Sequence, residues 1–518
     1  MLRFYAYLDF LALGVSVAVI FWLRNLRRRS GVPPGPPGRG LLSDNRAELQ
    51  ASGKPRWVVF DRWAKQYGPI FSVRLGLRTE IVITDTQVAW DLLEKRGDIY
   101  SSRPRNIVGG EILSKNFRGV FAPYGDRWRK FRKVLNIGLS GKQALTYRQF
   151  QALESCLLLE DILQDPASFT HSMERYSMST AFAVSYGSRI RTAEDRIVKE
   201  HDESFAALAQ AVIPGRYIVE HIPALLYLPK CLQWFRWEAE ARHEIDVRLL
   251  SSYLHQVRDK MDQGSVKECL SSRILSMKLP AGYTEAGVAY AAAAPYTAGV
   301  DTTSATLHVF MLAMLHYPDV MKKAQAELDS VVGRERLPTF EDEDFLPYCG
   351  ALIKEVTRWR PIGPLGVAHA VTRDDYYNGY YIPAGSTVWG CIYSMAKDER
   401  IFPQAEKFRP ERFLETTDPR LVDFTLPFGF GRRFCPGMHV ALQSVYIIIV
   451  RILWAFDVVP AVDAAGQPVL PDSEAFVQKS IVRQPAPFKF LLTPRGPEVA
   501  KMVEMEASEA KEMLKEWE

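Results

Sequence analysis

One stretch near the C-terminus, Phe428-Gly-Phe-Gly-Arg-Arg-Phe-Cys435-Pro-Gly437, restricts what this chain can fold into more than any other. It places a single cysteine behind a glycine-rich turn, and an apolar run from Val440 to Val450 follows. Glycine lets the backbone pass close to a flat group in conformations that residues with a Cβ resist. Cysteine is the haem ligand that pushes electron density onto iron. A buried free cysteine behind a turn is the alternative interpretation, so the remaining motifs have to decide.

Length and composition favour one large domain with a substantial core. The 518 residues contain no internal repeat and no low-complexity linker between about 45 and 495. Hydrophobic residues make up 47% and charged residues 24%, which is ordinary globular composition. The net charge of +5 is small and dispersed, which argues against nucleic acid as a partner. The six cysteines form no C-x-x-C pair and the histidines no ligand pair, so we expect free thiols and no non-haem metal site.

The N-terminus is predicted to be a membrane anchor, residues 1–29. Phe4–Leu23 is a twenty-residue apolar stretch interrupted by the charge of Asp9, close to the ~20 residues that cross a bilayer. Four arginines follow it directly, which predicts a cytosolic body. A cleaved signal peptide would carry its charges in front of the apolar stretch. The Pro/Gly-rich segment 30–44 that follows cannot continue a helix, and we interpret it as a stiff hinge.

The body is predicted to be mainly α-helical with small β-sheets, an α+β class. Ile70–Leu75 and 80–84 form short strands, with further short strands and turns over 364–395. The last stretch, 498–518, is interpreted as a charged, solvated and partly helical tail. Helical patterns are found in nine other places: 87–96, 126–137, 146–163, 169–186, 234–262, 284–316, 318–332, 345–359 and from Cys435 to about Phe456.

A polar sequence interrupts the apolar helix predicted over 284–316. Ala298-Gly-Val-Asp-Thr-Thr303 places four residues of lower helix propensity in mid-helix, where a threonine hydroxyl can divert a backbone carbonyl. Together they predict a groove with room for dioxygen, a water molecule and an acid. The alternative is a polar helix surface with a tolerated glycine. Pro295, three residues earlier, predicts a bend in this helix.

Two charged motifs accompany the groove. Glu355-Val-Thr-Arg358 places a carboxylate and a guanidinium three residues apart on one helix face. Trp128 and Arg132 lie four apart on a basic helix that can meet an anionic group. Arg127, Arg129, Lys130 and Lys133 make the same helix a candidate docking patch for an acidic partner.

Taken together, the Phe-x-x-Gly-x-x-x-Cys-x-Gly spacing and the other motifs resemble the cytochrome P450 monooxygenases, in particular fungal microsomal members of secondary metabolism. The resemblance implies the cytochrome P450 fold as a single catalytic domain over 45–497, with haem b as cofactor. It implies that Cys435 is the iron ligand and that Asp301 and Thr302 are catalytic, as proton relay and oxygen-activating hydroxyl. The implied cofactor-binding set is Cys435, Phe428, Gly437, Trp128, Arg132, Arg433 and His369.

The resemblance also implies a buried ion-pair network and a substrate chamber, and it departs from the family pattern at one position. The pair Glu355–Arg358 would be buried with Arg412 of the Pro-Glu-Arg-Phe sequence, in a network that serves folding and haem retention. At His369 the match departs from the family pattern, because Ala368 precedes it where proline is common. The segments implied to line a substrate chamber are apolar, which favours a lipophilic molecule; their candidate residues are Ile107, Val108, Phe205, Val212, Ala294, Ala298, Ile362, Leu365 and Ile481.

The resulting functional hypothesis is NADPH-dependent monooxygenation, with electrons from a membrane-bound reductase and cytochrome b5 as an optional second partner. The endoplasmic reticulum membrane is the expected location, with a single span. Terpenoid intermediates are the first expected substrates, and polyketides or indole-type compounds are alternatives. A haem isomerase or dehydratase of the same fold, or a haem-binding protein without activity, would not need the Asp301-Thr302 pair.

Overall fold

The computed structural model describes residues 31–38, 44–76, 78–213, 215–280, 282–479 and 481–518. The chain falls into two compact units: unit 1 comprises residues 1–104 and 368–395, and unit 2 comprises 105–367 and 396–518. The catalytic domain predicted over 45–497 therefore includes parts of both units. The predicted anchor, residues 1–29, and part of the predicted hinge, 39–43, lie outside the described residues.

Unit 1 is built on a four-stranded sheet with the order β1-β2-β6-β3. The predicted hairpin is present as β1 paired antiparallel with β2, from Ile70 opposite Ile83 to Leu75 opposite Arg78. The strands are β1 (Ile70–Leu75), β2 (Arg78–Ile83), β6 (Thr387–Gly390) and β3 (His369–Ala370), with a separate pair β4 (Asp375–Tyr377) and β5 (Tyr380–Ile382). The helices are α2 (Arg46–Ala51), α3 (Arg56–Tyr67), α4 (Thr86–Ala89), α5 (Gly97–Tyr100) and α17 (Ile392–Met395), with a π-helical turn at Trp90–Lys95.

The described part of the proline-rich segment is docked on this sheet. The Ser72 N–H donates to the carbonyl of Pro34 at 2.8 Å, and the Ser72 hydroxyl to that of Pro33 at 2.7 Å. At Gly35 an added Cβ would lie 1.9 Å from the Ser72 carbonyl oxygen. Glycine is therefore required there by a close backbone approach, and residues 33–35 are part of unit 1.

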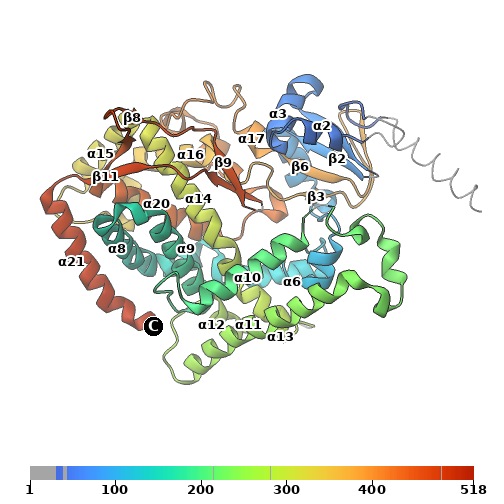
Figure 1. Cartoon of the computed structure of the whole chain (residues 1–518), viewed down its shortest axis with the longest axis horizontal. Helices are drawn as coiled ribbons and strands as arrows, with labels where there is room; N and C mark the ends of the chain where they lie inside the picture. Colours follow the sequence, from blue (N-terminus) through green and yellow to red (C-terminus); the bar gives the residue numbers. More distant parts are fainter. Residues whose placement is uncertain (1–30, 39–43, 77, 214, 281, 480) are drawn as a thin grey trace, which may run out of the picture. The chain divides into compact units, whose positions relative to one another are not determined.

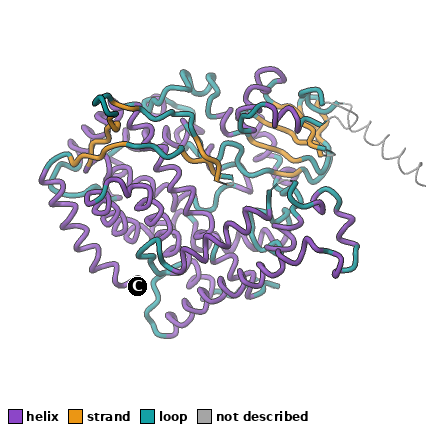
Figure 2. Tube along the Cα trace, in the orientation of Figure 1, coloured by secondary structure: helices purple, strands orange, loops and turns teal. Residues whose placement is uncertain are grey.

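Unit 2 contains the long helices and the largest apolar core (Figures 1 and 2). Its central helix α14 (Ala294–His316) packs against α9 (Phe169–Tyr186), α16 (Pro347–Trp359) and α20 (Met438–Ala455). Residues 303–315 of α14 are all buried. The other helices are α6 (Asp126–Leu139), α7 (Gly141–Ala144), α8 (Arg148–Gln164), α10 (Arg196–Ala211), α11 (Trp237–Asp262), α12 (Leu270–Leu275), α13 (Glu285–Ala292), α15 (Pro318–Val331), α18 (Arg412–Glu415), α19 (Pro419–Val422) and α21 (Pro497–Leu514).

The strands of unit 2 form two small sheets. The three-stranded sheet has the order β11-β7-β8, with β7 (Phe456–Val462), β8 (Pro468–Val469) and β11 (Phe490–Pro494) antiparallel. The hairpin of β9 (Phe476–Lys479) and β10 (Val482–Pro485) places β10 against α14. The predicted class, mainly helical with small sheets, is confirmed.

The helix predicted over 284–316 is interrupted near Pro295. Thr284 caps α13, which ends at Ala292, and α14 begins at Ala294 with Pro295 in its first turn. Proline is tolerated in a first helical turn because the missing N–H has no partner there in any case. The expected bend within one helix is therefore corrected to a junction between two.

Two described helical stretches are long and apolar enough to cross a membrane, Glu285–His316 and Met438–Ala455. In their most apolar windows 78% and 72% of the residues are buried inside the protein, which is typical of core helices. The single-span anchor at residues 1–29 stays a prediction.

The C-terminal stretch is not a solvated tail, as the sequence suggested, but a docked helix. α21 packs along α8 (Figure 1). Its buried residues recur on one helix face; they are Val499, Val503, Ala507, Ala510 and Leu514. Beyond it the Trp517 ring meets that of Phe150, with centroids 5.4 Å apart. The Glu and Lys residues that made the sequence look solvated lie mainly on the opposite face.

We expect Val503→Asp to destabilise unit 2 by roughly 3 kcal/mol, because it removes a buried side chain and places a carboxylate in an apolar contact. Met505→Asp is the matched control, since Met505 is 48% exposed on the same helix. Thermal unfolding and limited proteolysis around residue 497 measure the effect. Equal melting temperatures of the two variants would show that α21 adds no stability.

Candidate active site

The Cys435 loop is a compact turn in front of α20. The Cys435 N–H donates to the Phe428 carbonyl at 3.0 Å, and the Phe434 N–H to the Gly431 carbonyl at 3.1 Å. Gly429 and Gly431 have φ of +83° and +52°, a left-handed conformation that L side chains rarely adopt. Gly437 precedes α20, and no heavy atom lies within 4 Å of where its Cβ would be. The loop therefore has open space beside the cysteine.

The pKa of the Cys435 thiol is raised overall, because burial outweighs the groups around the sulfur that favour the thiolate. Burial raises the pKa of the thiol, whereas the Gly437 N–H, the Arg132 cation and the Met438 N–H lower it. Donors and a cation aimed at one sulfur stabilise negative charge on it. Among the described residues no group of three or more His, Cys, Asp or Glu side chains could hold a metal ion. A site in which one thiolate is the metal ligand fits haem better than zinc.

Two arginines hold this loop to its neighbours. Arg132 of α6 donates from Nη1 to the Phe434 carbonyl at 2.6 Å. Arg433 donates to the carbonyls of Gly119 and Ala122 at 3.0 and 2.7 Å, and its guanidinium lies 4.4 Å from the centre of the Trp128 ring. Trp128, Arg132 and Arg433, predicted from separate motifs, are thus brought to the same loop.

The polar sequence of α14 lies directly before the fully buried run of this helix. Ala298 is exposed, and Asp301 and Thr302 are partly exposed, although every residue from 303 to 315 is buried. The Thr302 hydroxyl donates to the Ala298 carbonyl at 2.9 Å, the local diversion that the sequence suggested. No described residue bonds to the Asp301 carboxylate. α14 packs against α20, the helix that follows Cys435.

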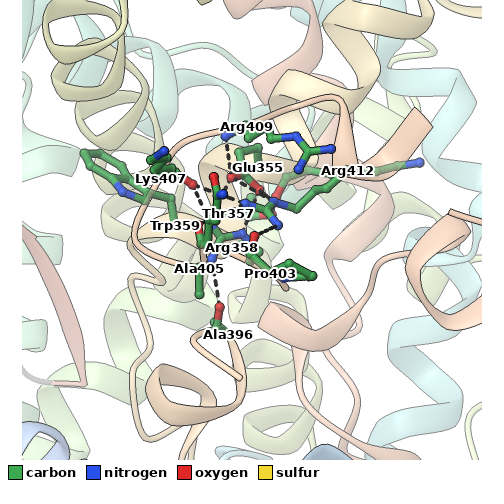
Figure 3. Close-up of polar contacts among 12 residues, drawn as sticks. Glu355, Thr357, Arg358, Trp359, Ala396, Pro403, Ala405, Lys407, Arg409 and Arg412 are labelled. Carbon is green, nitrogen blue, oxygen red and sulfur yellow. Dashed lines mark hydrogen bonds and ion pairs between the residues drawn. The ribbon is translucent and has the colours of Figure 1, made fainter. Parts of the chain in front are cut away.

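The fully buried Glu355–Arg358 pair lies in a network of polar contacts (Figure 3). Arg358 donates from Nε and Nη2 to both oxygens of Glu355, each at 2.7 Å. Arg412 donates from Nε to Glu355 at 3.2 Å, and the Arg409 N–H does so at 2.7 Å. Carbonyls complete the network: Arg358 reaches Ala396 and Lys407, and Arg412 reaches Pro403, Gln404 and Lys407. One carboxylate therefore balances two buried guanidinium groups.

The candidate chamber residues do not form one cluster. Ile107 and Val108 are buried, and Val212 packs against them. Phe205 stacks on His201 with ring centroids 6.0 Å apart. Ala294 and Ile362 pack against two other core clusters, Leu365 is partly buried, and Ile481 is 53% exposed. Ala298 lies on the open part of α14.

His369 belongs to unit 1 and the Cys435 loop to unit 2. His369 is buried and its Nδ1 donates to the Tyr100 carbonyl at 2.8 Å. Sequence reasoning missed Arg103 in the same unit, whose Nη1 donates to the Ala368 carbonyl at 2.7 Å. Burial lowers the pKa of the Arg103 guanidinium to about 9. Arg103 stands in the sequence Ser-Arg-Pro-Arg, which is typical of an exposed loop. The sequence therefore did not indicate that Arg103 is buried.

Comparison with known proteins points to one family. The family model "Cytochrome P450" matches residues 33–492. Cytochrome P450 monooxygenase 58 of Postia placenta is 38% identical over 501 residues, which cover 95% of this chain and 94% of its own. Cytochrome P450 monooxygenase aneD of Aspergillus aculeatus is 35% identical, covering 94% and 92%. A zebrafish cytochrome P450 solved with progesterone superposes with a TM-score of 0.69 at 25% identity, covering 85% of this chain and 100% of its own.

The chain belongs to the cytochrome P450 monooxygenase family. Family and fold imply haem b as the cofactor and electrons from an NADPH-dependent reductase. The residues present fit this cofactor: a cysteine with N–H donors and a cation near its sulfur, open space beside Gly437, and a partly exposed polar turn in the central helix. The protein is therefore an oxidoreductase that acts on a small molecule.

Proposed function

We propose that this protein inserts one oxygen atom from dioxygen into a lipophilic small molecule, with a terpenoid intermediate of fungal secondary metabolism as the first candidate. The observation that carries the proposal is the partly exposed polar turn at 298–302, which lies directly before the fully buried run 303–315 of α14. The mainly apolar candidate chamber residues support a lipophilic substrate. Polyketides and indole-type compounds are the competing substrate classes.

Each of several residues in unit 2 has a separate proposed role in the reaction. Haem held by Cys435 supplies the activation of dioxygen. Thr302 keeps its hydroxyl on the open turn, where its oxygen can accept a further hydrogen bond. The Asp301 carboxylate is partly exposed and can exchange protons with solvent. Trp128, Arg132 and Arg433 are proposed donors to the haem propionates, and Phe428 and Gly437 shape the loop. The same role for His369, in unit 1, stays a prediction from the family resemblance.

Two further proposals concern the protein's surroundings. An anchor at residues 1–29 would place the catalytic body on the cytosolic side of the endoplasmic reticulum membrane. The basic surface of α6, with Arg127, Arg129 and Lys133 exposed, is the proposed docking site for the reductase and for cytochrome b5.

The test is turnover by the full chain, co-expressed with a fungal reductase in microsomes and supplied with terpenoid, polyketide and indole compounds. We expect NADPH-dependent products with added oxygen, and terpenoids to be oxidised. Thr302→Ala and Asp301→Asn should each lower product formation by about a hundredfold, because a positioned proton donor is worth 10²–10⁴-fold. Mass spectrometry of the products measures both the substrate class and this loss.

Thr306→Val is the matched control for Thr302. Thr306 makes the same bond one turn later, from its hydroxyl to the Thr302 carbonyl at 2.9 Å, but it is buried. We expect this variant to keep nearly full turnover. Equal losses in Thr302→Ala and Thr306→Val would contradict a role for the open turn, and oxidation of polyketides or indoles alone would replace the terpenoid proposal.

A further inference from the structure

Asp246 of α11 is a fully buried carboxylate that the active site does not use. It accepts hydrogen bonds from three different elements. Arg242, one turn earlier on α11, donates from Nε at 2.8 Å, and the Ser204 hydroxyl of α10 donates at 3.0 Å. Arg118, from the segment in front of α6, donates from Nη2 at 3.3 Å. A buried carboxylate is stable where such partners satisfy it.

Arg118 is itself 9% exposed and is held on a second side by an aromatic ring. Its guanidinium lies 5.1 Å from the centre of the Tyr290 ring of α13, and that ring stacks on Phe117 with centroids 5.7 Å apart. The contact of Arg118 with Asp246 joins two elements, whereas that of Arg242 stays within one helix. Of the two arginines, Arg118 is therefore the one that fixes the relative position of separate segments.

The backbone directly before Arg118 has an uncommon conformation that neighbouring contacts must hold in place. Lys115 and Asn116 are consecutive non-glycine residues with φ of +47° and +57°. Residues in this region persist where the surrounding contacts hold them. At Gly119 an added Cβ would lie 2.1 Å from the Phe131 ring of α6, so the chain after Arg118 is also closely packed.

The same segment ends at the cysteine loop. The carbonyls of Gly119 and Ala122 accept hydrogen bonds from Nη1 and Nη2 of Arg433, whose guanidinium lies against Trp128. A continuous path of contacts thus runs from α10 and α11 through Asp246, Arg118 and residues 119–122 to Arg433. Each step of it is a hydrogen bond or a short stretch of backbone.

We propose that Asp246 and Arg118 form a latch that positions residues 118–122, and through them Arg433, so that α10 and α11 are coupled to the cysteine loop. Both are positioning residues and neither contacts the reacting atoms. A substrate that displaces α10 or α11 must then weaken the contact between Asp246 and Arg118. The displacement therefore also changes the position of the cysteine loop. The proposal extends the proposed function, but its backbone part is testable without turnover.

The matched pair of variants is Arg118→Met and Arg242→Met. Each removes one guanidinium from the same carboxylate and leaves the other in place, so neither strands Asp246 without a cation. In the purified full-chain holoprotein, without substrate or NADPH, we expect hydrogen exchange of amides 114–122 to rise about tenfold in Arg118→Met. Arg242→Met should leave it nearly unchanged, and Arg118→Lys should restore part of the protection.

The second measurement is the rate at which haem transfers from the same proteins to an apomyoglobin acceptor. We expect it to rise severalfold in Arg118→Met and not in Arg242→Met, because Arg433 loses its fixed carbonyl partners. Equal exchange and equal haem transfer in the two variants would overturn the latch. If Arg118→Met does not fold, Ser204→Ala and Arg118→Lys carry the same comparison against Arg242→Met. Lost turnover with unchanged exchange at 114–122 would count against the latch and leave the proposed function standing.

Discussion

Replacing Cys435 with alanine is expected to abolish the haem–thiolate CO spectrum and all NADPH-dependent product formation. The thiol is the proposed haem ligand; the Gly437 and Met438 N–H groups and Arg132 lower its pKa, and burial raises it. Removing even an outer partner of a metal ligand lowers affinity or activity by about 10–100-fold. Loss of the ligand itself should therefore exceed about a hundredfold. Difference spectra of reduced microsomes and product analysis measure the two effects.

Cys231→Ala is the control, because Cys231 is an exposed free cysteine on a short 3₁₀ turn at Lys230–Leu232. It should show a normal spectrum and normal turnover. A wild-type spectrum in Cys435→Ala would mean that another residue binds the iron and would overturn the assignment of the loop.

The local motifs could be predicted from the sequence because the geometry of each depends on residues that are neighbours in the chain. Glycines 429 and 431 stand where φ is positive, and the i,i+3 spacing of Glu355 and Arg358 closes a bidentate pair. Three of the four residues of low helix propensity after Ala298, namely Gly299, Asp301 and Thr302, are partly exposed, and Thr303 is buried. In each of these cases the chemistry of neighbouring residues decides the conformation, so one sequence suffices.

Contacts between distant segments were not readable in the same way. Nothing in the chain indicates that Asp246 meets Arg118, 128 positions earlier. The partly helical character of 498–518 was predicted, but the docking of α21 was missed because its many charges outweigh five small or apolar residues spaced along one face. The apolar chamber candidates were drawn from a resemblance, and residues such as Ile107 and Val108 pack into a core cluster. Burial depends on what packs from elsewhere, and residue type alone does not supply it.

The network around Glu355 depends partly on local residue spacing and partly on contacts between distant segments. The Glu355–Arg358 pair is local, but the arrival of Arg412 and of the Arg409 N–H depends on the chain returning 54 to 57 residues later. Both guanidinium groups are buried with a single carboxylate, and the Arg358 guanidinium also lies 5.4 Å from the Phe402 ring. The network therefore holds residues 396–412 against α16, with Glu355 as its one anion.

Glu355→Gln is accordingly expected to destabilise the protein by about 3–5 kcal/mol, since it leaves two buried cations without a counter-charge. The surface pair Arg409–Glu415 provides the control, because both side chains are exposed and such pairs contribute about 0–1 kcal/mol. Glu415→Gln should match the wild type in thermal unfolding and in yield of haem-loaded protein, whereas Glu355→Gln should give little holoprotein. If Glu355→Gln unfolds within about 1 kcal/mol of the wild type, the carbonyls of Ala396 and Lys407 suffice to hold Arg358, and the network does not depend on its carboxylate.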